Sequence, residues 1–323
     1  MNIIAGIDIG GTKCAISFAE YSDDIQILQR IAFPMPDSEP DAVLNLFAGH
    51  IREAINRHEG WKLMAVGVSC GGPLDSRTGV IISPPNLAKW RNVECVKTLE
   101  NMLQVPAALQ NDADACALAE WKWGAGKGCS NMVFLTFGTG MGAGIILNNA
   151  LYSGSTGIAG EVGHLRLADT GPIGHNKAGS FEGFCSGGGI ANLGRIEAEK
   201  AIRNGQPPMF CKSHEDLSSI TAKSIADAME KGDALAVEIY NTVGRYLGRG
   251  LAILIDILNP ERIVLGSIYV RQKHTLEAPM REQIAKEALS SSASSCLILP
   301  AGLGEQIGDY ASLCVGFSLI PHK

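Results

Sequence analysis

The feature that most constrains this chain is a design that occurs twice, in which a turn of glycine and threonine joins two apolar strands. The first copy covers residues 3–18 and turns at residues 10–12. The second covers residues 132–147 and turns at residues 138–142. Apolar, β-branched runs on either side of such turns predict strand, turn and strand. Because the copies lie about 130 residues apart, we predict two related domains rather than a solenoid.

The length of 323 residues also suits two domains of about 150 residues each. We place the boundary where a strand at residues 107–110 runs into Asn111. This predicts a smaller N-terminal α/β domain, residues 1–108, completed by a C-terminal helix at about 309–323. Residues 109–308 would form a larger α/β domain.

Apolar residues predict several helices from residue 113 onward. They cover residues 113–122, 190–202, 234–258 and 309–317. Asn259 and Pro260 mark the end of the longest one. A further strand is expected at residues 262–266.

Composition excludes several classes of protein. Lys and Arg number 27 and Asp and Glu number 33, a net charge of −6 that disfavours broad binding to nucleic acid or to anionic membranes. No apolar run reaches the ~20 residues that cross a bilayer, and no leader pattern precedes the first strand. The nine cysteines are scattered, as expected for reduced thiols. We therefore expect a cytoplasmic protein that acts on a small molecule.

The first turn is a candidate phosphate site. Gly10 and Gly11 expose backbone N–H groups, and Thr12 adds a hydroxyl next to Lys13. Such a turn can bind phosphate oxygens, and Asp8 is placed to hold Mg²⁺ directly or through water. An ordinary hairpin turn is the alternative interpretation.

The second turn, with Gly138, Thr139 and Gly140, is not a dinucleotide fingerprint, because a strand rather than a helix follows it. Two such turns in matching positions could instead grip a nucleoside triphosphate from opposite sides of a cleft. Gly266 ends a strand and is a third candidate, for packing on an adenine ring. A plain turn there is the alternative.

Asn111 and Asp112 stand between a strand and an alanine-rich helix. Either side chain could simply cap that helix. Asp112 also lies where the two domains should meet, and an ionised carboxylate within reach of a substrate hydroxyl is what a phosphoryl-transfer base requires.

Glu161, His164 and Glu182 lie in glycine-rich segments further along the chain. With Asn111 and Asp112 they form a polar set suited to the paired hydroxyls of a sugar. The alternative is a set of surface carboxylates with a satisfied histidine. Structural zinc is not expected, because His164 and its neighbours lack cysteine pairs.

Taken together, these motifs resemble the ROK family of sugar kinases and related repressors along nearly the whole chain. The matching segments are, in chain order, DIGGTK at 8–13, GGPLD at 71–75, PNL at 85–87, NDA at 111–113, LTFGTGMG at 135–142, EVGH at 161–164, and Glu182.

The resemblance implies an actin-like ATPase fold of two α/β domains around a central cleft. It implies ATP-dependent phosphorylation of a hexose hydroxyl, usually at the sixth carbon, by a homodimer. Asp112 would take the hydroxyl proton, and the hairpins at Gly10 and Gly138 would hold phosphates whose charge Mg²⁺ offsets. The sugar would be held by Gly72, Asn86, Asn111, Asp112, Glu161, His164 and Glu182.

Two departures from the family pattern matter. Ile173, His175 and Ser180 stand where many members carry zinc-binding cysteines, so we expect zinc to be lost and His164 to need another partner. Family repressors carry an N-terminal winged-helix domain, whereas this chain starts in its first hairpin. A repressor role is therefore not expected.

Three functions remain open at this point. The first is a glucokinase-like ATP:hexose kinase. The second keeps the chemistry but takes N-acetylmannosamine, N-acetylglucosamine, fructose or allose, selected by the loops at residues 71–73 and 84–86. The third is a sugar-sensing protein or a chaperone-like ATPase on the same fold.

Overall fold

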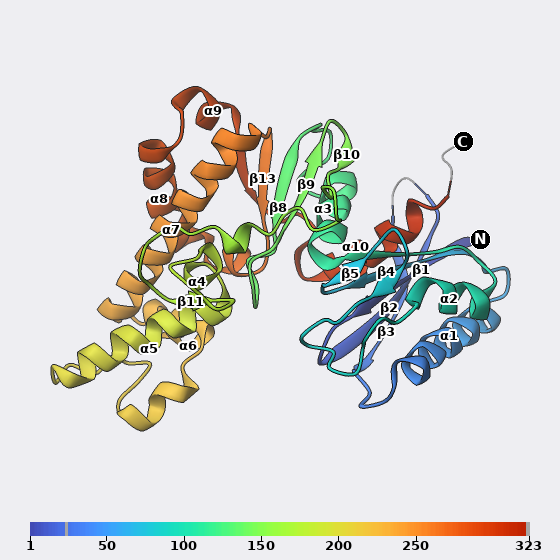
Figure 1. Cartoon of the computed structure of the whole chain (residues 1–323), viewed down its shortest axis with the longest axis horizontal. Coiled ribbons are helices and arrows are strands. Elements are labelled where there is room, and N and C mark those ends of the chain that lie inside the picture. Colours follow the sequence, from blue (N-terminus) through green and yellow to red (C-terminus); the bar gives the residue numbers. More distant parts are fainter. Residues whose placement is uncertain (23–24, 321–323) are drawn as a thin grey trace.

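The computed structural model describes residues 1–22 and 25–320, which form two lobes that are each built on a five-stranded mixed sheet (Figure 1). The two sheets have the same topology: three antiparallel strands followed by two parallel ones. This match confirms that the two strand–turn–strand copies build equivalent sheets. The strand orders are β3 (Ile27–Pro34), β2 (Lys13–Glu20), β1 (Asn2–Ile9), β4 (Lys62–Cys70) and β7 (Ala107–Asn111), and β10 (Ala150–Leu151), β9 (Ala143–Leu147), β8 (Met132–Leu135), β13 (Arg262–Leu265) and β14 (Leu297–Pro300).

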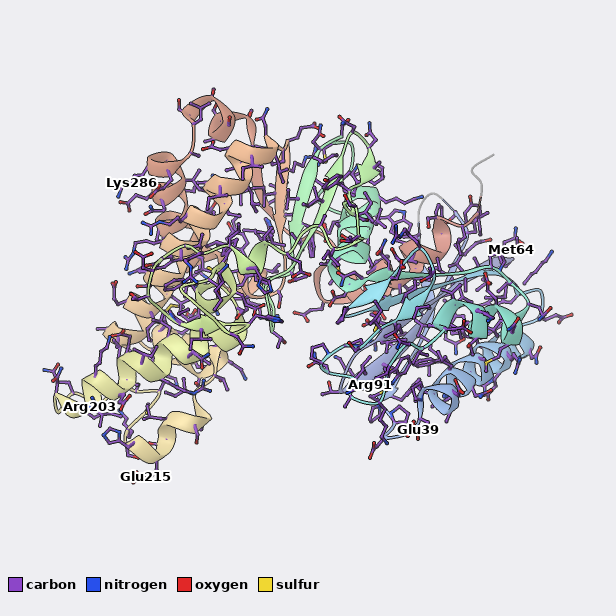
Figure 2. All side chains as sticks on the ribbon, in the orientation of Figure 1. Glu39, Met64, Arg91, Arg203, Glu215 and Lys286 are labelled. Carbon is purple, nitrogen blue, oxygen red and sulfur yellow. The ribbon has the colours of Figure 1, made fainter. Side chains whose placement is uncertain are left out.

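Helices cover both sheets. In the first lobe they are α1 (Pro40–Arg57), α2 (Cys95–Leu103) and α10 (Ile307–Phe317); α3 (Asp112–Trp123) follows β7. The second lobe carries α4 (Phe181–Phe184), α5 (Gly187–Arg203), α6 (Ala222–Glu230), α7 (Ala234–Leu258), α8 (Ile268–Glu287) and α9 (Ser290–Ser295). Short hairpins pair β5 (Leu74–Asp75) with β6 (Val80–Ile81) and β11 (Ile173–Gly174) with β12 (Lys177–Ala178). Charged side chains such as Arg203, Glu215 and Lys286 lie on the outer surface (Figure 2).

Strand β1 separates two layers of the core, because successive side chains of a strand point to opposite faces. Ile3, Ile7 and their odd-numbered neighbours pack with α1. Ile4 packs with Leu313 and Phe317 of α10 on the other face. Burial on both faces explains why β1 reads as a continuous apolar run.

Helix α10 packs directly on the backbone of the two central strands. A Cβ on Gly67 of β4 would overlap Ser312 and Gly316, and one on Gly6 of β1 would lie 2.5 Å from Ser312 Oγ. The same helix packs against α3, which lies on β8 and β9. The two sheets are therefore linked through a contact between α3 and α10 (Figure 1).

Most of the predicted elements are present, and the differences have local causes. Helix α7 has the predicted bounds and ends with Asn259 in the left-handed conformation. The strand expected at residues 132–137 stops at Leu135, because the chain then closes a tight loop in which Phe137 has a φ of 36°. Sequence analysis missed α8, whose pattern is interrupted by Pro279 and by a kink at Gln272. The last helix begins at Ile307, two residues earlier than expected, and residues 321–323 of the predicted segment lie outside the described residues.

Within the described residues, no helix is long and apolar enough to cross a membrane.

The close approach of α10 generates a stability prediction. We expect Gly67→Ala to lower the free energy of unfolding by about 3 kcal/mol, because the new methyl group meets helix backbone that cannot move aside alone. Gly49→Ala is the control: its Cβ would point into open space within α1, so we expect a gain of about 1 kcal/mol. Urea denaturation measures both, and equal effects of the two substitutions would contradict this account.

Candidate active site

Three parallel strands of the first lobe end at the same edge of their sheet. Ile9 of β1 pairs with Cys70 of β4, and Cys70 pairs with Asn111 of β7. The segments that follow these strands are the Gly10 turn, the Gly71 turn and the start of α3. Residues far apart in the sequence are thus brought to one place by strand register alone.

Asn111 and Asp112 share the task of starting α3. Asn111 caps the helix: its Oδ1 accepts a hydrogen bond from the N–H of Ala113 at 3.0 Å. Oδ1 of Asp112 accepts from the same N–H at 2.8 Å. The capping interpretation is therefore correct for Asn111, and Oδ2 of Asp112 faces Gly71, 4.0 Å from where a Cβ of that glycine would lie.

The next residue of this turn, Gly72, lies close to Asn111. A Cβ on Gly72 would lie 3.3 Å from Nδ2 of Asn111. The strand-end glycines thus leave the space in front of Asn111 and Asp112 open.

Acidic groups at this edge raise each other's proton affinity. Asp112 is exposed at the surface, but the protein atoms packed around its carboxyl desolvate it and raise its pKa, with a further contribution from the charge of Glu161. Burial raises the pKa of Asp8 to about 6, and the charges of Asp309 and Asp112 add to the effect. Asp114, buried in the first turn of α3, has its pKa raised to about 7 by burial and then by Asp112 and Glu161. Sequence analysis did not single out Asp114 or Asp309.

The first glycine turn is exposed to solvent, and backbone hydrogen bonds hold its two ends. The N–H of Gly10 donates to the carbonyl of Lys13 at 3.2 Å, and the carbonyl of Thr12 accepts from Met35 at 3.0 Å. A Cβ on Gly11 would lie 2.7 Å from that of Asn86. The structure thus brings the 84–87 loop against the first glycine turn.

The second turn is held by Glu182. The N–H of Met141 donates to Oε2 of Glu182 at 3.0 Å, and a Cβ on Gly140 would lie 2.8 Å from the same oxygen. One of the predicted sugar ligands therefore lies directly against a predicted phosphate turn. The turn itself closes through the N–H of Gly138, which donates to Gly140 at 3.0 Å.

A cavity of about 670 Å³ opens beside this second turn. Gly138 and Thr139 line one side, and the first turns of α5 and α8 line another. The N–H of Gly187 donates to the carbonyl of Gly138 at 2.7 Å, and the N–H of Ile268 donates to that of Phe137 at 3.0 Å. Two helix N-termini thus meet the turn, an arrangement that favours negatively charged groups.

Sequence analysis missed most of this cavity. A Cβ on Gly266 would face Phe134 and Thr136, and its neighbour Ser267 lines the cavity; the packing of Gly266 on an adenine ring stays a prediction. The glycine run at residues 187–189 could have pointed to this cavity in the sequence. Several polar side chains that line the cavity come from separate helices, and no sequence pattern connects them. They are Arg195, Lys223, Asp227, Tyr240, Arg271 and Gln272.

Glu161 and His164 lie at a short 3₁₀ turn, Val162–His164. Nε2 of His164 is 4.0 Å from Oε2 of Glu161, and its ring packs edge-to-face on His175 at 4.6 Å between centroids. His175, which stands at a family cysteine position, thus contacts the ring of His164. Within the described residues, no group of three or more His, Cys, Asp or Glu side chains is arranged to hold a metal ion.

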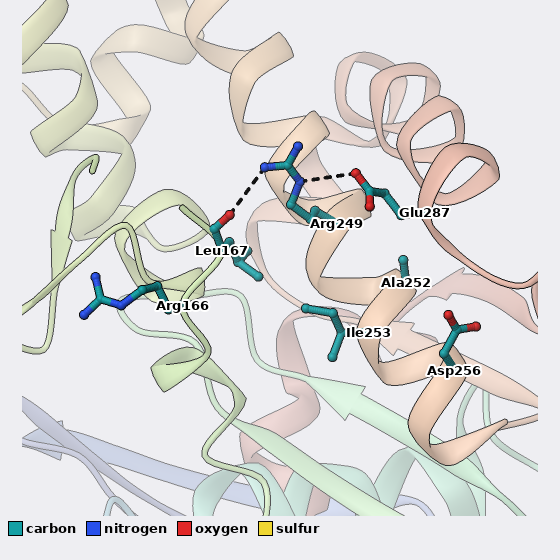
Figure 3. Close-up of a pocket in the computed structure, with 7 residues that line it drawn as sticks. All are labelled: Arg166, Leu167, Arg249, Ala252, Ile253, Asp256 and Glu287. Carbon is teal, nitrogen blue, oxygen red and sulfur yellow. Dashed lines mark hydrogen bonds and ion pairs between the residues drawn. The ribbon is translucent and has the colours of Figure 1, made fainter. Parts of the chain in front are cut away.

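A smaller cavity of about 250 Å³ lies between α7 and residues 166–167 (Figure 3). Arg249 crosses it, donating to the carbonyl of Leu167 at 3.3 Å and lying 3.6 Å from Glu287. None of the predicted site residues lines this cavity.

With this geometry in place, comparison with known proteins identifies the class. The sequence profile of the ROK family matches residues 4–313, and the chain belongs to the ROK family. Its fold is the actin-like ATPase fold of the ROK sugar kinases, as expected.

Among its relatives are glucokinases. The chain is 29% identical to the glucokinase of Halalkalibacterium halodurans over 94% of this chain and 91% of that protein. The structure of a ROK glucokinase from Streptomyces griseus, in complex with glucose and AMPPNP, superposes with a TM-score of 0.77 at 26% identity and covers 98% of this chain and 99% of that one. These relatives support a sugar kinase.

Regulators of the same family are also similar. The DNA-binding transcriptional dual regulator NagC of Escherichia coli is 26% identical over 98% of this chain and 74% of its own length. The structure of a ROK transcriptional regulator, a homologue of the E. coli MLC protein, has a TM-score of 0.85 at 23% identity and covers 98% of this chain and 78% of that one.

The buried carboxyl of Asp114 generates a pH prediction. Its pKa of about 7 lies above the ordinary value of 3.8, so between about pH 4 and 7 the folded chain binds more protons than the unfolded chain and stability falls as the pH rises. We expect Asp114→Asn to remove this loss and to raise the free energy of unfolding at pH 8 by about 2–4 kcal/mol, with little change near pH 4.

Urea denaturation at both pH values measures the effect, and Asp169→Asn, at an exposed carboxyl, is the control. A variant with no gain at pH 8 would show that the Asp114 carboxyl titrates normally.

Proposed function

We propose that this protein transfers the γ-phosphoryl group of ATP to a hexose hydroxyl, most simply O6 of glucose, with Asp112 as the general base. The observation that carries the proposal is the position of the Asp112 carboxyl. It lies at the sheet edge where β1, β4 and β7 end, faces Gly71 and adjoins Asn111.

Asp112 suits the role of base on electrostatic grounds. Burial and Glu161 raise its pKa, and a base whose pKa lies closer to the working pH accepts a hydroxyl proton more readily. The hydrogen bond from Ala113 at the helix N-terminus keeps the carboxylate accessible and oriented. In this proposal the base takes the proton as the hydroxyl oxygen bonds to phosphorus, and ADP leaves.

The sugar would be held by the polar groups around Asp112. Asn111 precedes it in the chain, the charge of Glu161 acts on its carboxyl, and His164 lies between Glu161 and the ring of His175. Glu182 uses one oxygen on Met141 and would offer the other to the ring. Gly72 and Asn86 would shape the opposite wall, where the Gly11 turn begins.

The nucleotide would lie across the two glycine turns. The 670 Å³ cavity beside Gly138 and Thr139 has room for a nucleoside and ends at two helix N-termini suited to phosphates. Asp8, Gly10, Gly11, Thr12 and Lys13 would meet the terminal phosphates from the first lobe. Movement of the lobes toward each other would exclude water from the reaction.

Magnesium fits the same edge. Mg²⁺ in phosphoryl-transfer sites is held by one or two carboxylates together with substrate phosphates rather than by a protein cage. Asp8 carries surplus negative charge next to the Gly10 turn, and this favours a cation there. When bound, Mg²⁺ would offset the charge of the transferring phosphates.

Two alternatives to a glucose kinase also have support. N-acetylmannosamine, N-acetylglucosamine, fructose or allose would use the same ring contacts and differ at the 71–73 and 84–86 loops. A non-catalytic sugar sensor is supported by the similarity to NagC. The retained Asp112 favours catalysis over sensing. The domain boundary at residues 108 and 109, the homodimer and the cytoplasmic location stay predictions.

The direct test is an ADP-release assay with ATP, Mg²⁺ and a panel of these sugars. We expect ADP to form only when a sugar is added, with glucose among the best. Sugar-independent hydrolysis, or no turnover with any sugar, would favour the sensor or ATPase alternatives.

The assignment of the base is tested by Asp112→Asn. We expect the turnover number to fall at least about a hundredfold, because the amide cannot accept the proton, while the dissociation constant for sugar changes little. Glu161→Gln is the contrast: it should raise the KM for sugar with a smaller effect on turnover. Turnover that survives in Asp112→Asn would exclude Asp112 as the base.

A further inference from the structure

Four residues form a row across the first sheet beneath α10. Gly67 of β4 pairs with Gly6 of β1, Gly6 pairs with Ser17 of β2, and Ser17 pairs with Arg30 of β3. Residues paired in this way share a face of the sheet. The two glycines allow α10 to lie close to the central strands. Beyond them, the polar pair Ser17 and Arg30 contacts the first turn of α10.

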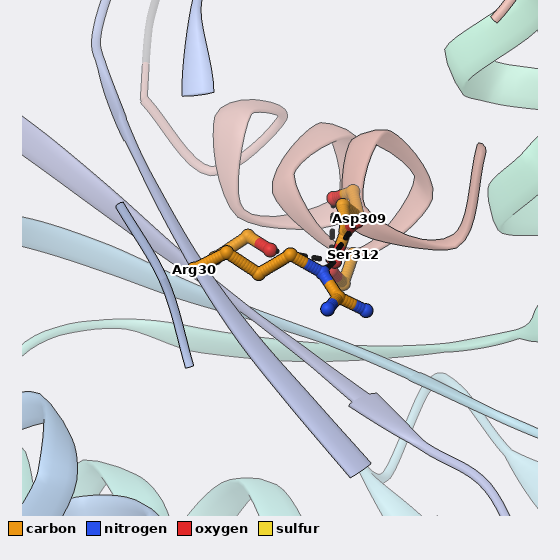
Figure 4. Close-up of polar contacts among 4 residues, drawn as sticks. Arg30, Asp309 and Ser312 are labelled. Atoms are coloured by element: carbon orange, nitrogen blue, oxygen red, sulfur yellow. Dashed lines mark hydrogen bonds and ion pairs between the residues drawn. The ribbon is translucent and has the colours of Figure 1, made fainter. Parts of the chain in front are cut away.

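Asp309 is the residue of α10 that meets this polar pair (Figure 4). Ser17 Oγ donates to Oδ1 of Asp309 at 2.7 Å, and Nε of Arg30 donates to both carboxylate oxygens at 2.9 Å. Asp309 is only 6% exposed, so its charge is held inside the lobe by these donors.

The same helix turn lies against Asp8. A Cβ on Gly308 would lie 2.9 Å from Oδ2 of Asp8, so the carboxyl of Asp8 and the backbone next to Asp309 are in contact. The charge of Asp309 raises the pKa of Asp8 by more than the charge of Arg30 lowers it. The cluster therefore leaves net negative charge beside Asp8, although Asp309 is itself paired.

We propose that Asp309 is a positioning residue for the divalent cation that accompanies the nucleotide. This inference rests on the proposed function. Asp309 does not touch the cation; it attracts it through Asp8 by adding a fixed, buried negative charge. Arg30 and Ser17 make that burial tolerable, because an unpaired carboxylate in the interior would be far more costly.

The proposal predicts opposite effects for two substitutions in one ion pair. Asp309→Asn keeps the shape and an acceptor for Ser17 but removes the negative charge, so it should weaken cation binding about tenfold. Arg30→Gln removes the positive charge and should tighten it about threefold. A merely structural role would make both substitutions weaken binding, because both lower stability.

The measurement is a titration of Mn²⁺, as a paramagnetic substitute for Mg²⁺, into the full chain with AMPPNP, followed by electron paramagnetic resonance. Ser17→Ala is the matched control, because it removes a donor to the same carboxylate without changing charge. It should leave the Mn²⁺ affinity within twofold of the wild type while lowering the melting temperature, which is recorded for every variant.

Weaker Mn²⁺ binding in Arg30→Gln, or unchanged binding in Asp309→Asn, would overturn the proposal. If Asp309→Asn does not fold, Arg30→Gln decides alone: tighter binding supports the proposal, and equal or weaker binding overturns it. The titration needs neither sugar nor turnover. A wild-type protein that binds Mn²⁺ and AMPPNP but releases no ADP with sugars would therefore overturn the kinase proposal and leave this inference standing.

Discussion

The parallel register of β1, β4 and β7 is the constraint on which the rest of the structure depends. It makes three strands end at one edge, and so it gathers Asp8, the Gly71 turn and Asp112, which lie about a hundred residues from end to end in the sequence. Ligands of open α/β sheets bind beyond the carboxyl ends of the strands, where loops and helix N-termini meet. The chemistry of this edge follows from its surplus of carboxylates, which favours cations and hydroxyl donors.

A second consequence of that register is the way α10 serves both lobes. Gly6 and Gly67 allow it to lie on the backbone of β1 and β4, and its other side packs on α3. The helix that carries Asp309 past Asp8 is therefore also the helix through which the lobes touch. Stability, lobe contact and the electrostatics of the proposed cation site are coupled through this one element.

The sequence predicts those parts of the candidate site that a local pattern encodes. The glycine turns stand between β-branched strands, and Asn111 followed by Asp112 stands between a strand and a helix, so their positions could be predicted. The residues that sequence analysis missed belong together only in space. Arg30 and Asp309 are 279 residues apart, and the cavity beside Gly138 takes its polar residues from different helices. Helix α8 was missed because Pro279 and the kink at Gln272 interrupt its periodicity.

In the proposed function, the edge of the first sheet presents the Asp112 carboxylate to a sugar hydroxyl, and the Gly10 and Gly138 turns bind the nucleotide. A crystal structure of the protein with glucose, AMPPNP and Mg²⁺ tests it most directly. The account predicts the O6 hydroxyl at about 2.6–3.2 Å from the Asp112 carboxylate, with the terminal phosphate between the Gly10 and Gly138 turns. A sugar bound away from Asp112, or a nucleotide that touches neither turn, would contradict it.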